Sequence, residues 1–111
     1  MNEWRLEGVV VREPVRQDFG RGTKTELLLE VDESYERDGF KTEKLVRHPV
    51  ENWGSLLDNL KLGFRIRVSG SVSTRPWEDK RSQQLKYFPS LRATDIEVLE
   101  QPEQVTPEFP L

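Results

Sequence analysis

Residues 64–75, FRIRVSGSVSTR, decide the fold because their character alternates from one residue to the next. Apolar residues and Gly70 occupy one set of alternate positions as far as Val72, while arginine and serine occupy the other. A period of two is typical of a β-strand with one face toward a core. Gly70 falls within the apolar set, which indicates a place where a small barrel bends or is crossed closely.

Four further strands are predicted on either side of this one. They span residues 2–12, 25–32, 40–48 and 86–99. Gly8 interrupts the apolar positions of the first strand as Gly70 does in the fourth. Pro14 and Pro49 are expected to end the pairing of the first and third strands. Asp38-Gly39 is a signal for a tight hairpin turn.

A short helix is predicted between the third and fourth strands. Asn52 is a plausible N-cap, and Gly63 stands where a C-terminal glycine belongs. Helical spacing (i, i+3, i+4, i+7) links Trp53, Leu56, Leu57 and Leu60. The sequence therefore predicts an all-β fold: a five-stranded OB-fold barrel with one short helix between strands 3 and 4. This domain spans residues 1–99, and residues 100–111 form a short acidic, proline-containing tail that is expected to be disordered.

Composition argues against an enzyme. The 111 residues include no cysteine and one histidine, His48, so no disulfide and no usual zinc site is expected. No catalytic constellation is visible, and we expect no metal and no cofactor. No apolar run is long enough for a signal peptide or a membrane helix, so a cytoplasmic protein without membrane contact is expected.

The net charge of −3 leaves nucleic-acid binding open. Residues 1–99 contain 17 basic and 17 acidic side chains, and the other three acidic residues are Glu100, Glu103 and Glu108. A neutral domain carries a basic groove only if the two signs separate in space. The sequence does not show whether they do.

The ordered series of segments resembles the bacterial single-stranded DNA-binding protein family. The similar segments are residues 2–8 (NEWRLEG), 12–16 (REPVR), 22–23 (GT), 62–72 (LGFRIRVSGSV) and 74–79 (TRPWED), so the resemblance covers about residues 2–99. It implies an OB fold, self-association as a dimer or tetramer, and sequence-tolerant binding of single-stranded DNA in replication, recombination or repair. The mode implied is base stacking beside a basic groove.

The resemblance also implies roles for individual residues. Trp77 matches a stacking tryptophan of the family, and Tyr35 falls near another stacking position. Lys44 and Val50 stand where the family has a tryptophan and a phenylalanine, so affinity for each site is expected to be lower or the stacking residues to have moved. The end of the chain resembles the family's partner-recruiting tip, which here is Phe109, Pro110 and Leu111.

Local context supports the same interface. Trp77 and Tyr35 lie in charged, polar segments where a core role is not expected, and Phe40 and Tyr87 are divided between core edge and stacking. The basic residues assigned to the phosphates are Arg12, Arg16, Lys44, Arg65, Arg67, Arg75, Lys80, Arg81 and Lys86. Ordinary surface pairing with glutamates is the alternative for these cations. Trp53 is expected in the core, and Trp4 is expected either in the core or at a subunit interface. The alternative functions are an OB-fold protein-interaction module, such as a primosome-like accessory factor, and an RNA-binding domain.

Overall fold

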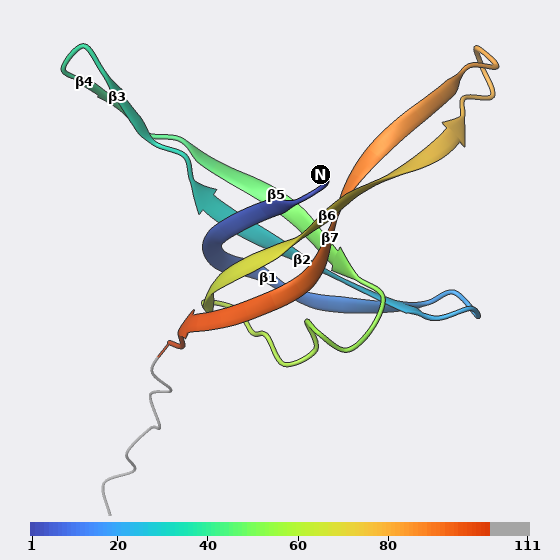
Figure 1. Cartoon of the computed structure of the whole chain (residues 1–111), viewed down its shortest axis with the longest axis horizontal. Coiled ribbons are helices and arrows are strands. Elements are labelled where there is room, and N and C mark those ends of the chain that lie inside the picture. The colour runs from blue at the N-terminus through green and yellow to red at the C-terminus, as the bar shows by residue number, and fades with distance from the viewer. Residues whose placement is uncertain (103–111) are drawn as a thin grey trace, which may run out of the picture.

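Five strands close into a barrel, which confirms the predicted fold (Figure 1). The computed structural model describes residues 1–102, apart from the side chains of Arg75 and Trp77. The strands of this part are β1 (Trp4–Asp18), β2 (Thr23–Asp32), β3 (Tyr35–Arg37), β4 (Phe40–Thr42), β5 (Leu45–Asn52), β6 (Arg65–Glu78) and β7 (Leu85–Glu100). The barrel order is β1-β2-β5-β7-β6. A short parallel pairing of β5 with β7 closes it, with Val50 opposite Leu91 and Glu51 opposite Arg92.

Alternating apolar residues of these strands fill the barrel. The buried apolar side chains are Val10, Leu27, Leu29, Val31, Val50, Leu57, Leu60, Ile66, Val68 and Ala93. Trp4 packs against this cluster from its edge, and its indole Nε1 donates a hydrogen bond to the Ser71 carbonyl at 2.9 Å. The period of two along residues 64–75 was therefore interpreted correctly as far as Gly70. Val72 is already partly exposed, where β6 leaves the barrel.

Gly8 and Gly70 lie where a neighbouring strand approaches closely. A Cβ atom on Gly8 would lie 2.3 Å from the carbonyl oxygen of Glu30, and one on Gly70 would lie 1.7 Å from that of Arg92. At Gly70 the pairing of β6 with β7 shifts by one residue, which leaves Thr94 as an extra residue of β7. Both glycines thus allow a close crossing that no side chain would permit, as the sequence predicted.

The predicted helix between the third and fourth strands is wrong. No residue of 1–102 is helical, and none of this part forms a helix that could cross a membrane. Residues 53–63 instead form bends and turns, with i to i+3 hydrogen bonds such as Leu60 N–H to the Leu57 carbonyl (3.3 Å). The turns bury Leu57 and Leu60 as a helix would, and Gly63 adopts the expected positive φ of 87°. Helical spacing marked these two buried leucines correctly, but a series of turns also satisfies it.

Trp53, at the start of this connection, does not fill the core. Its side chain is 39% exposed and packs against Phe19, with the ring centroids 5.4 Å apart. Leu57 and Leu60 supply the buried side chains of the connection instead. The expectation that Trp53 fills the core is therefore wrong.

Two strand boundaries also differ from the prediction. β1 continues past Pro14 to Asp18, because the proline lies at an irregularity of the β1–β2 ladder between Arg12 and Val15. The predicted third strand over 40–48 is divided into β4 and β5, and β5 continues through Pro49 to Asn52. An antiparallel ladder uses the N–H of only every second residue toward a given neighbour, so it tolerates proline at the other positions.

Besides the end of the β1–β2 hairpin, two longer hairpins, called arms below, project from the barrel (Figure 1). One arm is the pair β3–β4, whose turn has Asp38 and Gly39 at φ values of 53° and 80°, as expected for the predicted tight hairpin. The other is the outer part of β6–β7, which pairs as far as Glu78 opposite Leu85. The two arms diverge, and together with the barrel they extend the molecule to 66 × 50 × 31 Å.

Candidate nucleic-acid interface

The β6–β7 arm presents apolar and aromatic side chains to solvent. Tyr87 and Phe88 are adjacent in β7, and both are more than half exposed because the arm has no core beneath it. Trp77 is paired with Lys86 in the backbone register, and Arg75 is paired with Phe88. The arm therefore brings the predicted residues Trp77, Lys86, Tyr87 and Arg75 onto one hairpin, and it adds Phe88, which we had not assigned to the interface.

The end of this arm is organised by Asp79. Its carboxylate accepts hydrogen bonds from the backbone N–H of Arg81 (3.0 Å) and forms an ion pair with Lys86 Nζ (3.3 Å). These contacts, the Arg81 N–H first, hold the pKa of Asp79 below its usual value. Asp79 is thus ionised at neutral pH and fixes the turn that carries the exposed Lys80 and Arg81.

The β3–β4 arm carries the other two predicted aromatic residues. Tyr35 in β3 is 52% exposed and Phe40 in β4 is 78% exposed. At the base of the arm, Ser34 N–H donates to the Asp32 carboxylate (2.9 Å), and the hydroxyl and N–H of Ser34 keep the pKa of Asp32 low. Lys44 lies in the connection to β5 rather than in a strand, and its N–H donates to Ser34 Oγ (3.0 Å).

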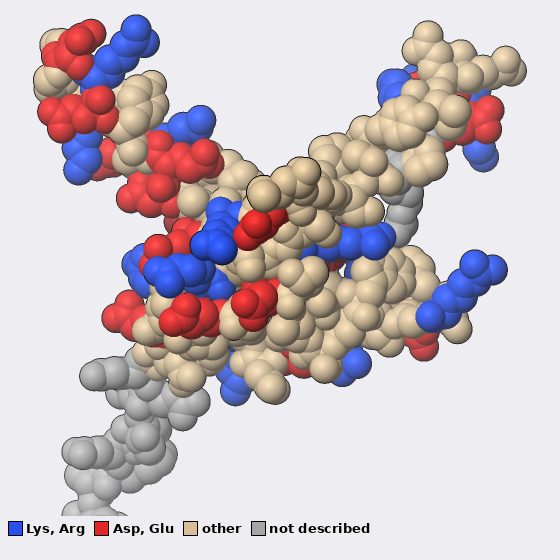
Figure 2. Space-filling view, viewed as in Figure 1, with Lys and Arg blue, Asp and Glu red and all other residues tan. Residues whose placement is uncertain are grey.

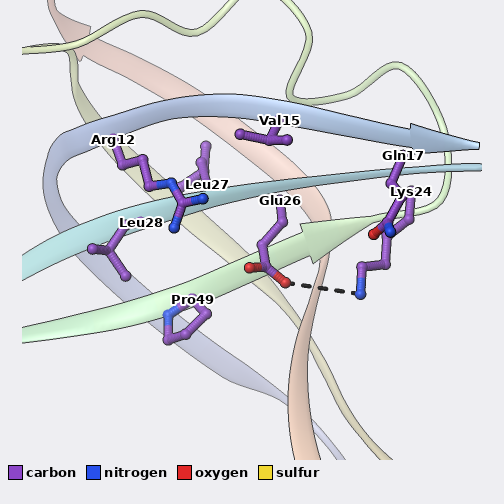
Figure 3. A pocket seen from close by; sticks show the side chains of 8 residues that line it. All are labelled: Arg12, Val15, Gln17, Lys24, Glu26, Leu27, Leu28 and Pro49. Carbon is purple, nitrogen blue, oxygen red and sulfur yellow. Dashed lines mark ion pairs between the residues drawn. The ribbon is translucent and has the colours of Figure 1, made fainter.

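A shallow channel on the outer face of β2 and β5 lies near the bases of the arms. Its first part, shown in Figure 3, has a volume of about 220 Å³ and is lined by Arg12, Val15, Gln17, Lys24, Glu26, Leu27, Leu28 and Pro49. A neighbouring hollow of about 330 Å³ shares Glu26 and Pro49 and reaches Pro89 to Leu91 of β7, where the β6–β7 arm begins. β5 itself starts beside the β3–β4 arm at Leu45. Arg12, a predicted phosphate contact, therefore lies on a surface that runs toward the arms.

A buried carboxylate beside this channel holds two cations that are not among the predicted phosphate contacts. The side chain of Glu51 is only 7% exposed and forms ion pairs with Lys24 Nζ (3.3 Å) and Arg92 Nε (3.6 Å). Lys24 also pairs with Glu26 (3.8 Å; Figure 3). The Arg92 Nε atom is itself buried without a hydrogen bond. Only barrel closure, which pairs Glu51 with Arg92, reveals this network.

Replacing Glu51 by glutamine is expected to lower the free energy of unfolding by about 1–2 kcal/mol, because two cations then lose a buried carboxylate. The loss is smaller than for a fully buried pair because Arg92 reaches solvent. Urea denaturation of the full chain measures it. The control is Glu30→Gln, which breaks the more exposed Arg47–Glu30 pair (3.1 Å) and should cost less than about 1 kcal/mol. Equal losses for the two variants would contradict the buried role of Glu51.

Three of the predicted phosphate contacts are paired with acidic side chains away from the arms. Arg65 pairs with Glu100 (3.5 Å), and Arg67 pairs with Glu7 (3.8 Å) and Glu97 (3.4 Å). Both lie at the end of β6 opposite to its arm. Arg16 pairs with Asp58 (3.4 Å) of the connection after β5. The alternative of a surface paired with acidic residues therefore describes the surroundings of these three arginines better than a free basic stripe does.

Charge is dispersed over the face of the molecule that Figure 2 shows. In Figure 2, basic and acidic side chains intermingle over the barrel and at the ends of both arms, while the stretch from the barrel toward the end of the β6–β7 arm is mostly uncharged. On this face, the described residues of the arms show no concentrated basic patch, and their exposed aromatic side chains are the distinctive feature.

The protein is a five-stranded OB-type barrel with two hairpin arms that expose aromatic side chains. This architecture is typical of the class of OB-type barrels that bind nucleic acids. Residues 1–99 match the model of the Single-strand binding protein family, and the chain belongs to that family. The family resemblance found in the sequence is thereby confirmed.

Individual relatives agree with this assignment. Single-stranded DNA-binding protein 1 of Chlorobaculum tepidum is 27% identical over 105 residues, which cover 89% of this chain and 65% of that protein; this chain therefore spans just under two thirds of its length. Among solved structures, the complex of a Plasmodium falciparum single-strand binding protein with single-stranded DNA superposes with a TM-score of 0.73 at 25% identity, covering 90% of this chain and 96% of the other. A deletion mutant of the Thermus aquaticus single-stranded DNA-binding protein superposes with a TM-score of 0.76 at 25% identity, covering 90% of this chain and 51% of that one.

Proposed function

We propose that this chain binds single-stranded DNA with little dependence on sequence, by base stacking on the arms and phosphate contacts beside them. The observation that carries the proposal is the exposure of aromatic side chains on two hairpins that have no core to fill. A base stacked on an aromatic ring contributes about 1–3 kcal/mol whatever its identity. Tyr35, Phe40, Trp77 and Tyr87 are the proposed stacking residues.

The phosphate contacts in this proposal come from cations on or near the arms. They are Arg12, Lys44, Arg75, Lys80, Arg81 and Lys86, with Arg16, Arg65 and Arg67 retained as secondary contacts that must exchange an acidic partner for a phosphate. In such an exchange, the free energy lost by breaking the existing ion pair offsets part of the free energy gained from the phosphate contact. Affinity is therefore expected to depend on salt, but less steeply than for a protein with a continuous basic groove.

The finer aspects of the proposal follow the family. We propose a binding protein without catalytic activity that is located in the cytoplasm. It self-associates as a dimer or tetramer and acts in replication, recombination or repair. Phe109, Pro110 and Leu111 are proposed to recruit replication or repair proteins, and they lie outside the described residues. β7 extends to Glu100, so the proposed tail begins no earlier than the residue after it.

The test is a titration of intrinsic tryptophan fluorescence with a thymidine oligomer of about 35 nucleotides at low and high salt. Quenching that saturates, and whose apparent affinity falls as salt rises, is expected from stacking combined with phosphate contact. RNA of equal length, added as a competitor, should displace the DNA less well. Absence of quenching and of any change in anisotropy of labelled DNA at low salt would refute the proposal.

A protein-interaction module is the second candidate, and the surface of the β6–β7 arm favours it. Leu85, Tyr87 and Phe88 all expose more than half of their area there, and exposed apolar surface of this kind is common at protein interfaces. The two candidates separate in the titration, because an interaction module binds no thymidine oligomer at any salt concentration.

A further inference from the structure

The two arms separate at a gap between β5 and β7. Within the described part of the chain these strands pair at two positions only, residues 50–51 of β5 with residues 91–92 of β7. Toward the arms, β5 follows β2 and β7 follows β6, so the two strands diverge from the point of closure (Figure 1). Each of them therefore has one edge that faces the gap instead of a neighbouring strand.

Each of these edges carries a proline close to the point of closure, Pro49 in β5 and Pro89 in β7. Both prolines lie within regular antiparallel ladders, Pro49 opposite Leu28 of β2 and Pro89 opposite Thr74 of β6. A proline has no N–H, so an antiparallel ladder accommodates it where its nitrogen points away from the paired strand. The nitrogens of Pro49 and Pro89 therefore point toward the gap.

The positions of these prolines match the end of the β5–β7 ladder. A parallel ladder uses the N–H of every second residue on each of the two facing edges. From the existing pairs toward the arms, the next donor on β5 belongs to residue 49 and the next donor on β7 belongs to residue 89, and both are proline. The strands themselves continue, β5 to Leu45 and β7 to Leu85. The ladder thus ends because both edges lack a donor, while both strands still run on.

The gap lies between the two sets of proposed stacking residues. Its floor is the hollow of about 330 Å³ that Pro49 and Pro89 line from opposite sides. If the ladder continued in the same register, Val46 of β5 would be paired with Tyr87 of β7. The β6–β7 arm would then lie along β5, next to the start of the β3–β4 arm. The ring of Tyr87, which is now 62% exposed, would lose part of that exposure.

We propose that Pro49 and Pro89 are positioning residues, which end the closure of the barrel after two residue pairs and hold the arms apart so that one DNA strand contacts both. The inference rests on the proposed function and adds to it the spacing of the two arms. Neither proline needs to contact DNA in this role. The alternative is a purely protective role, in which prolines on an open edge prevent pairing with other chains. That role predicts no change in the length of DNA that spans the arms.

The double variant Pro49→Thr, Pro89→Thr restores a donor to each edge, and threonine suits an exposed strand. If the ladder then extends, the new amide hydrogens of residues 49 and 89 should exchange at least about tenfold more slowly than that of the control Pro76→Thr. Pro76 lies on the same arm, but its side of β6 faces no strand in the described residues, because β1 pairs with β6 only over residues 65–70. Hydrogen exchange followed by NMR on the full chain without DNA, at two protein concentrations, measures this. Pro49→Thr alone restores the first donor and should protect residue 49 even where the double variant does not fold.

The second measurement is the affinity for labelled thymidine oligomers of about 6 to 35 nucleotides. The double variant is expected to reach its maximal affinity with shorter oligomers than the unaltered chain and Pro76→Thr do, because its arms lie closer together. Rapid exchange at residues 49 and 89, or protection that appears only at the higher protein concentration, would overturn the inference. Protected amides with an unchanged oligomer length would overturn it as well, and in both cases the proposed function stands. Absence of binding by the unaltered chain would overturn the proposed function and this inference together.

Discussion

Replacing Trp77 by alanine is expected to weaken binding of a thymidine oligomer by about 1–3 kcal/mol, which corresponds to roughly a 5- to 150-fold rise in Kd. The physical reason is that one base loses its stacking partner. Trp77 lies on an arm outside the barrel, paired in the register with Lys86. The midpoint of thermal unfolding should therefore change little, and fluorescence anisotropy of a labelled oligomer at fixed salt measures the loss.

Two companion variants make this result specific. Trp77→Phe keeps a ring and should retain most of the affinity. Leu85→Ala removes an exposed apolar side chain from the same arm but no ring, so it should bind normally. If Trp77→Ala binds as tightly as the unaltered chain, or if Leu85→Ala weakens binding equally, then Trp77 does not stack a base.

Replacing Gly70 by alanine is expected to destabilise the fold by at least about 3 kcal/mol. The added methyl group would meet the Arg92 carbonyl at 1.7 Å, a separation that only movement of the backbone could relieve. Gly70 is paired with Trp4 of β1 on one side and with Ala93 of β7 on the other, so neither neighbour can move without opening the barrel. Urea denaturation, or loss of soluble protein where the variant does not fold, measures the effect.

Ser71→Ala is the control for this substitution, because it alters the next residue of β6 without adding an atom. Its unfolding free energy should lie within about 0.5 kcal/mol of the unaltered chain. If the Gly70→Ala protein is as stable as the Ser71→Ala protein, the crossing of β6 and β7 accommodates a methyl group, which contradicts the close contact inferred at Gly70.

The local features of this fold were largely predictable. Three of these features agree with the structure: the alternation from residue 64 as far as Gly70, the left-handed turn at Asp38-Gly39 and the close crossing at Gly70. Each depends on a few consecutive residues. The spacing of apolar residues after β5 did not distinguish a helix from a series of turns, because consecutive turns bury Leu57 and Leu60 equally well. The continuation of β5 through Pro49 depends on which of its edges faces a neighbour, and this is a property of the sheet.

The candidate interface was predictable to a smaller extent. Tyr35 is exposed as expected, because a short hairpin without a core must expose its side chains. For Phe40, which the sequence left between core edge and stacking, the structure decides in favour of exposure. The pairing of Arg67 with Glu7 and Glu97 joins residues 60 and 30 positions apart in the chain, so their neutralisation depends on the register of three strands. The neutralisation of Lys24 and Arg92 also depends on the arrangement of the strands, because both cations pair with the same carboxylate, that of Glu51.

The sequence by itself determined the barrel and its family, because strand periodicity, tight turns and crossing glycines are encoded over short stretches of chain. The tertiary structure alone decided which cations are already paired, which aromatic residues share a surface, and that Trp53 faces outward. The physical reason is that ion pairing and exposure depend on distances between strands, and these distances are fixed only when β5 and β7 close the barrel.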